Sequence, residues 1–188
     1  DLQRAGDLLL APDGKHTIVA GQPGYGKSGG AIVIVDPEAA EFDVVKQPFL
    51  PQSAWTLATT RDDDVILVGT SMYGGSGAPK VVTPGRLVLW RLSTREAIEE
   101  FTPWENEYVI NSLVRIGDEV WFSGAPGGSI GVFDLAKREV VHLMDPGYGR
   151  GKLYLRSEDG CLYSSAQGGV FRIDPTTREC QYMRDRHR

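Results

Sequence analysis

Short apolar runs alternate with polar turn segments along the whole chain. The four most regular runs are residues 31–35, 87–90, 130–133 and 170–173, and each is followed by a short polar segment that ends in Glu. These glutamates are Glu41, Glu96, Glu139 and Glu179, so the pattern returns at intervals of roughly 40 to 55 residues. Self-similarity at such an interval indicates that one structural unit is repeated in tandem. We therefore expect four copies of the same unit.

Each repeat divides further into four short stretches, separated by turn signals at regular spacing. An Asp lies in every first turn, at 13, 63, 118 and 159, where its side chain can accept hydrogen bonds from the backbone that follows. No amphipathic helix with capping residues is found, which predicts an all-β array. The strands are expected at 7–10, 16–20, 31–35 and 42–45; at 54–60, 65–68, 87–90 and 97–101; at 109–116, 120–122, 130–133 and 140–144; and at 152–156, 162–163, 170–173 and 180–183.

The third strand of a repeat ends in an apolar residue followed by Asp. The pairs are Val35-Asp36, Phe133-Asp134 and Ile173-Asp174, and Trp90-Arg91 stands at the same place in the second repeat. This pattern resembles the blades of WD-repeat and YVTN-type β-propellers over nearly the whole chain. The Gly-His element of WD repeats is missing, so we assign no specific family. We expect a β-propeller with four four-stranded antiparallel blades, at approximately 7–47, 52–101, 107–144 and 151–183.

Propellers usually close a ring of four to eight blades. The chain begins on a predicted first strand and ends on a predicted fourth, so we expect no strand to be exchanged between its ends. We predict part of a larger, seven- or eight-bladed ring, with a complete four-bladed ring as the alternative. An open arc exposes sheet faces that invite pairing with another chain. A protein partner or a homo-oligomer that completes the ring is therefore expected.

The charge, the apolar runs and the cysteines of the chain bear on which partners and which compartment it can have. The net charge of -5 argues against a nucleic-acid partner, because neutralising phosphates requires a basic surface. No apolar run reaches the roughly 18 residues of a membrane-spanning helix. Cys161 and Cys180 are expected on the second and fourth strands of one blade, too far apart for a disulfide. We expect a soluble chain; the compartment stays open, with a secreted or periplasmic location among the alternatives.

Residues 21–28, Gly-Gln-Pro-Gly-Tyr-Gly-Lys-Ser, match the spacing of a nucleotide-binding P-loop. Such a loop needs a helix to begin at the lysine, because the amides and dipole of the helix N-terminus hold the phosphate. Two glycines and the β-branched run 31–35 follow instead, which predicts a Gly-rich hairpin loop and no cofactor. His16 and His142 lie far apart in predicted strands, and Asp62–Asp64 offers too few oxygens for calcium, so no metal is expected.

In a four-stranded blade, the loop after the second strand and the blade-to-blade connection share one rim. All long, irregular loops fall on that rim. The opposite rim receives short turns with Arg-Glu pairs, which we expect to be exposed cross-strand pairs: Arg95-Glu96, Arg138-Glu139 and Arg178-Glu179. Functional residues concentrate on long loops, where aromatic rings suit sugars and cations suit acidic groups. The candidate ligand-binding residues are Tyr25, Lys27, Tyr73, Lys80, Trp104, Tyr148 and Arg150.

The one-sided loops favour a binding module that recognises a glycan or another small polar ligand. Residues 69–77 are also similar to loops of bacterial propeller proteins associated with polysaccharide breakdown, which implies a carbohydrate. A scaffold for protein–protein interaction or self-assembly is one alternative, because propellers serve many functions. A lyase or hydrolase acting on polysaccharides is another. The sequence shows neither an acid–base pair nor a nucleophilic serine, so it favours a protein that is not an enzyme.

Overall fold

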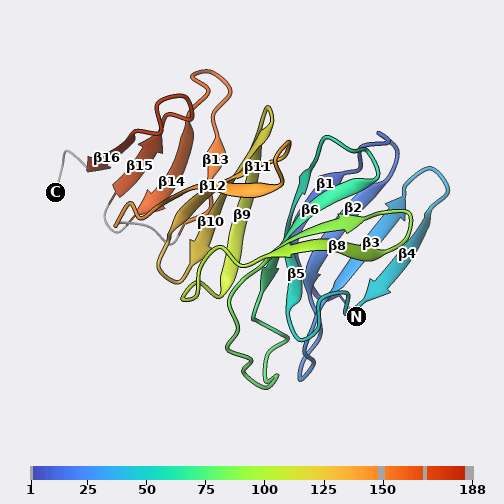
Figure 1. Cartoon of the computed structure of the whole chain (residues 1–188). Coiled ribbons are helices and arrows are strands. Elements are labelled where there is room, and N and C mark those ends of the chain that lie inside the picture. The colour runs from blue at the N-terminus through green and yellow to red at the C-terminus, as the bar shows by residue number, and fades with distance from the viewer. Residues whose placement is uncertain (1, 148–150, 167–168, 185–188) are drawn as a thin grey trace.

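The computed structural model describes residues 2–147, 151–166 and 169–184, which form sixteen strands and no helix. Each set of four consecutive strands makes an antiparallel meander, and we call these meanders blades 1 to 4. A single residue pair, Ser71 with Val109, joins blades 2 and 3 into one eight-stranded sheet. Figure 1 shows the four blades side by side in chain order, from blade 1 at the right to blade 4 at the left. The all-β, four-stranded architecture predicted from the repeats is confirmed.

The strand bounds follow. Blade 1 contains β1 (Arg4–Leu10), β2 (Thr17–Gln22), β3 (Ala31–Asp36) and β4 (Glu41–Lys46). Blade 2 contains β5 (Ser53–Thr59), β6 (Val65–Ser71), β7 (Leu87–Arg91) and β8 (Glu96–Phe101). Blade 3 contains β9 (Val109–Ile116), β10 (Glu119–Ala125), β11 (Ile130–Asp134) and β12 (Glu139–Met144). Blade 4 contains β13 (Tyr154–Leu155), β14 (Leu162–Ala166), β15 (Gly169–Ile173) and β16 (Cys180–Arg184). Every expected strand is present, although β13 is shorter than the predicted 152–156.

The turn between the third and fourth strands explains the recurrent sequence. In blade 3 the Asp134 carboxylate accepts hydrogen bonds from the amides of Ala136 and Lys137, both at 2.9 Å. Asp36 and Asp174 form the same turn in blades 1 and 4. The residue before the recurrent Glu has a positive φ in every blade; these residues are Ala40, Arg95, Arg138 and Arg178. The repeat therefore encodes a tight reversal into the fourth strand.

The arginines of these turns contact the preceding blade, which corrects the prediction of cross-strand pairs with the neighbouring glutamates. The ion pairs are Arg95–Asp43 at 3.3 Å, Arg138–Glu99 at 4.0 Å and Arg178–Glu119 at 2.9 Å. Each of these arginines has a positive φ and lies in the turn before the fourth strand. Its side chain is therefore not part of the cross-strand pairing of the blade.

Apolar clusters fill the space between adjacent blades. In β3, Ile32 and Ile34 face blade 2 and pack in one cluster with Val88 and Trp90 of β7. Equivalent clusters join blade 2 to blade 3 and blade 3 to blade 4. Their largest fully buried side chains are Trp90, Trp121, Phe122, Phe133 and Phe171. Each inner blade is thus buried on both faces.

The four blades form an open arc. Lys152 of blade 4 reaches toward blade 1, where its Nζ donates to the Gly6 carbonyl at 3.2 Å and lies 5.8 Å from the Trp55 ring centroid. Leu8 and Phe42, on the side of blade 1 away from blade 2, are nevertheless 65% and 71% exposed. No blade covers that side, so the alternative of a closed four-bladed ring is wrong. The prediction of part of a larger ring is confirmed.

Candidate ligand-binding site

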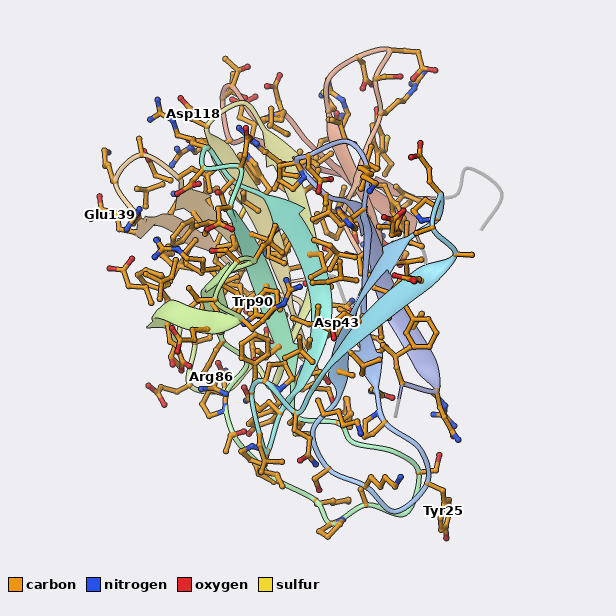
Figure 2. All side chains as sticks on the ribbon, turned by 90° about the vertical axis from the view of Figure 1, so that its right-hand side faces the viewer. Tyr25, Asp43, Arg86, Trp90, Asp118 and Glu139 are labelled. Carbon is orange, nitrogen blue, oxygen red and sulfur yellow. The ribbon has the colours of Figure 1, made fainter. Side chains whose placement is uncertain are left out.

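Two long loops of neighbouring blades interlock at one rim. The first rim loop (residues 23–30) joins β2 to β3, and the second rim loop (residues 72–86) joins β6 to β7. The Gly26 amide donates to the Ser76 carbonyl at 2.8 Å, and the Gly75 amide donates to the Lys27 carbonyl at 2.9 Å. Both loops lie together at the lower end of Figure 1 and Figure 2, where Tyr25 marks the tip of the first. The loops therefore form a single structure.

Glycines permit this contact. A Cβ atom on Gly75 would overlap the carbonyl oxygen of Gly24, so neither loop could approach the other with a larger residue there. Gly77 has a φ of +78° and lies against the ring of Tyr25, which again requires a residue without a side chain. The Gly-rich composition of both loops is thus explained by their packing against each other.

A buried polar network fixes the return of the second rim loop. Gln52, only 1% exposed, donates through Nε2 to Thr83 Oγ1 at 2.8 Å and to the Pro84 carbonyl at 2.6 Å. Its Oε1 accepts from Thr70 Oγ1 at 2.7 Å and from Arg86 Nε at 2.8 Å. The network fixes the C-terminal end of the second rim loop to the strands β5 and β6, so this end of the loop is held in one position.

The second rim loop borders a pocket of about 600 Å³. Aromatic rings come from Tyr73 and Tyr108, and cationic groups come from Arg4 and Lys80. Arg4 is held in place because its Nη2 donates to Ser76 Oγ at 2.9 Å. The remaining wall is mainly backbone and aliphatic, from Gln22, Met72, Gly74, Gly75, Ser76, Ala78, Pro79, Val81 and Val82. None of these lining residues carries a carboxylate, so the charge of the pocket is positive.

The predicted site residues divide between this pocket and other places. Tyr73 and Lys80 both line it. Tyr25 and Lys27 lie on the first rim loop, where Lys27 borders a separate hollow of about 240 Å³. Trp104 does not join them: it packs on Phe122 at a centroid distance of 5.0 Å and lies, partly buried, against the core cluster between blades 2 and 3. Tyr148 and Arg150 lie outside the described residues.

The segment with P-loop spacing adopts the predicted hairpin. β3 begins at Ala31, directly after the two glycines, so no helix N-terminus faces the loop. The hollow beside Lys27 is lined by Pro23, Lys27, Ser28, Gly30, Lys46 and Gln47. The amides needed for a nucleotide cradle are therefore not assembled there.

Comparison with known proteins defines the fold class. No family model and no curated protein matches the chain. Solved structures do match: U3-55K, with a TM-score of 0.70 and 15% identity, and the WD40 repeats of RRP9, with a TM-score of 0.69 and 15% identity. The extracellular domain of BT4673 from B. thetaiotaomicron matches with a TM-score of 0.69 and 14% identity.

The chain is part of a β-propeller. The comparisons cover 98%, 98% and 97% of this chain but only 52%, 52% and 24% of the three matched chains, so it spans about half or a quarter of their length. At these identities the likeness shows the fold alone. The WD-like blades inferred from the strand endings are confirmed.

The opposite rim of the propeller carries carboxylates that serve its turns. Hydrogen bonds from the His16 side chain, 2.6 Å away, and from backbone amides lower the pKa of Asp13 to about 2. The Tyr163 hydroxyl, 2.6 Å from Asp159, is the main cause of the lowered pKa of that carboxyl. Both carboxylates are thus held by donors of their own turns. Figure 2 shows this rim at the end that bears Asp118, away from Tyr25.

Sequence reasoning missed two pocket residues. Arg4 was placed before the first expected strand, which in fact starts at Arg4 itself. Tyr108 lies in the connection before β9, where its carbonyl accepts from the Met72 amide at 3.0 Å and its amide donates to the Ala125 carbonyl at 2.8 Å. The length of the rim connection 103–108 could have pointed to Tyr108, but only the folded structure shows that Tyr108 and Tyr73 line the same pocket.

Within the described residues, no three His, Cys, Asp or Glu side chains gather closely enough to hold a metal ion. The described part of the chain also contains no helix that is long and apolar enough to cross a membrane. Cys161 is buried, Cys180 is exposed, and the two are not joined by a disulfide, as expected from their strand positions.

Proposed function

We propose that this propeller segment is a binding module that holds a small polar ligand with an acidic group in the rim pocket, and that an acidic sugar is the ligand class that fits best. The observation that carries the proposal is the lining of the 600 Å³ pocket, which combines two tyrosines with two cations and contains no carboxylate. A volume of this size accommodates a ligand of one to a few rings.

The tyrosines supply flat apolar faces with a polar tip. A sugar ring offers one face of C–H groups, so it stacks on an aromatic ring while its hydroxyls reach polar partners. Tyr73 is 53% exposed, so its ring remains accessible after the loops have interlocked. Such a ring on a braced loop costs little conformational entropy when a ligand binds.

The cations select an acidic group. Arg4 is positioned by its hydrogen bond to Ser76, and Lys80 is an exposed residue of the same lining. Charge-assisted hydrogen bonds to a carboxylate or phosphate are roughly twice as strong as neutral ones. A neutral oligosaccharide would use the tyrosines but leave both cations without a partner, so the acidic one is expected to bind more tightly.

The test is thermal melting and calorimetry with an oligouronate and its carboxyl-reduced, neutral counterpart. A ligand at one hundred times its Kd adds about 2.7 kcal/mol of stability, which for a chain of this size is roughly 5 to 10 °C. Lys80→Ala should weaken the acidic ligand by about tenfold and the neutral ligand little, whereas Tyr73→Ala should weaken both.

Matched controls are Lys137→Ala, an exposed lysine in a turn of the opposite rim, and Tyr154→Ala, an exposed tyrosine of blade 4. Neither should alter binding. Any shift with magnesium-ATP should be unchanged in Lys27→Ala, because a strand rather than a helix follows the P-loop-like segment. The proposal fails if no acidic ligand shifts the melting temperature, or if a ligand that does so binds Tyr73→Ala and Lys80→Ala as tightly as the unmodified chain.

A further inference from the structure

The outward face of blade 1 is apolar and uncovered. Leu8, Leu10 and Phe42 on this face are 65%, 58% and 71% exposed. A groove of about 410 Å³ on the same face is lined by Leu2, Val19, Val33, Phe42, Val44 and Lys46. Monomeric proteins rarely expose a contiguous apolar patch of this kind, so the face marks an interface.

The sequence of β3 supports the same conclusion. Residues 31–35 read Ala-Ile-Val-Ile-Val, with no polar residue in alternation, a pattern typical of strands buried on both faces. Only one of the two faces is covered: Ile32 and Ile34 pack against blade 2, whereas Val33 lines the open groove. In β7, by contrast, all of Leu87–Trp90 are buried. Blade 1 is thus built for a neighbour on each side.

The position of the open face shows what kind of neighbour it takes. Val33 and Val35 occupy the places of Val88 and Trp90 in β7, counted back from Asp36 and Arg91. Val88 and Trp90 face the preceding blade, with which they share a cluster. The open face of blade 1 therefore matches the surface by which a blade stacks on the one before it.

We propose that blade 4 of a second copy covers this face, so that two copies close an eight-bladed ring. The inference does not depend on the ligand proposed above. Four blades occupy half of an eight-bladed ring, and a twofold axis repeats the same junction twice. Both open faces of each copy are then used, and a heterologous contact that closes in this way does not continue into fibres.

The ion pair found at two junctions within the chain is replaced by uncharged residues at the proposed junction. At the contact of blade 1 with blade 2, Arg95 of the following blade pairs with Asp43, whose strand partner is Ile34. At the next contact, Arg138 pairs with Glu99, whose strand partner is Leu89. At the proposed junction, Ala40 of blade 1 stands in the place of the turn arginine. Gln181 of blade 4, which is the strand partner of Arg172, stands in the place of the acidic acceptor. Both are uncharged, so neither leaves a buried charge unpaired.

The uncovered face of blade 4 offers the matching surface. Phe171 and Ile173 pack against blade 3, so Val170 and Arg172 of the same strand point to the open side. Val170 and Met183 are 41% and 37% exposed. Arg172 is the cation of this face, and the exposed ring of Phe42 on blade 1 provides the aromatic surface on which a guanidinium stacks.

The test is the mass in solution, by analytical ultracentrifugation across a range of concentrations. The closed ring predicts a species of twice the 20.6 kDa of one chain and nothing larger. Phe42→Asp and Val170→Asp alter the two sides of the junction, and each should weaken dimerisation by about 30-fold or more. Leu50→Asp, which is 57% exposed in the connection to blade 2, is the matched control and should leave the dimer intact. Circular dichroism checks that all variants are folded.

Mixing the two monomeric variants distinguishes this junction from a symmetric contact between two blade 1 faces. In the mixture one junction combines both substitutions and the other combines neither, so the dimer mass should partly return. A symmetric contact would be lost in Phe42→Asp and unaffected by Val170→Asp. A chain that stays monomeric at all concentrations, assemblies that grow without limit, or a dimer that survives both substitutions would each overturn the proposal.

Discussion

Replacing Gln52 tests whether the buried polar network braces the wall of the rim pocket. In Gln52→Leu the volume of the side chain is nearly kept, but all five of its hydrogen bonds are lost. The groups left behind differ in their access to water, so the cost can be assigned to particular atoms. The expected result is a destabilised chain whose second rim loop is released.

The largest cost comes from Thr70. Its hydroxyl is fully buried and donates to Gln52 Oε1, so the substitution leaves a buried donor without an acceptor, at about 1–3 kcal/mol. Arg86 loses the same oxygen but keeps Glu100 and the Phe49 carbonyl, so we expect about 1 kcal/mol there. Thr83 and Pro84 are partly exposed and regain water. The net loss is about 2–4 kcal/mol, or about 4–16 °C in Tm.

The assay is urea unfolding followed by tryptophan fluorescence at one fixed protein concentration. Gln3→Leu makes the same chemical change at an exposed position and should stay within about 0.5 kcal/mol of the unmodified chain. The double variant Gln52→Leu/Thr70→Val should lose less free energy of unfolding than the two single variants together, because it no longer contains the Thr70 hydroxyl that Gln52→Leu leaves without an acceptor. If Gln52→Leu unfolds at the same urea concentration as Gln3→Leu, the network does not stabilise the fold.

Three further outcomes are expected. Gly75→Ala should separate the two rim loops, because its Cβ would overlap a carbonyl oxygen of the first rim loop, and faster amide hydrogen exchange confined to both loops would show it. Arg178→Ala should cost up to about 1 kcal/mol in urea unfolding and Arg138→Ala less, since their ion pairs measure 2.9 and 4.0 Å and are partly exposed. Asp13→Asn should make the loss of stability on acidification less steep. The His16 hydrogen bond lowers the pKa of Asp13 in the folded chain to about 2, against about 3.8 in the unfolded chain. The stabilisation by the Asp13 carboxylate is therefore complete above pH 3.8 and disappears as the pH falls toward 2. Urea midpoints between pH 5 and 2 measure this, and an unchanged acid slope would contradict it.

The blades were predictable because their signals are local. Each strand, each Asp turn and each positive-φ residue is specified within a few positions, and the recurrence of Glu41, Glu96, Glu139 and Glu179 aligns the repeats. Rim loops were likewise predictable from their length and glycine content. Tyr73 and Lys80 entered the candidate set by this route, and the structure brings both to one pocket.

Contacts between blades were not predictable in the same way. Trp104 looks like an exposed rim aromatic in the sequence, but its ring fills space beside Phe122, a contact that exists only once blades 2 and 3 have stacked. The turn arginines look paired with the glutamates beside them, yet they lie in a turn with positive φ and form ion pairs with the preceding blade. In both cases the partner lies far away in the sequence, so no local pattern identifies it.

The proposed ligand pocket and the proposed junction between two copies use different residues of blade 1. The rim pocket takes Arg4 and Gln22 from the ends of β1 and β2, whereas the proposed junction uses the outward face around Phe42. None of the six residues that line the groove of that face also lines the pocket. A ligand that binds the pocket should therefore bind Phe42→Asp with unchanged affinity per chain, even when the dimer is lost. Loss of binding together with the dimer would mean that the second copy completes the pocket, and the site would then have to be assigned to the ring rather than to a single chain.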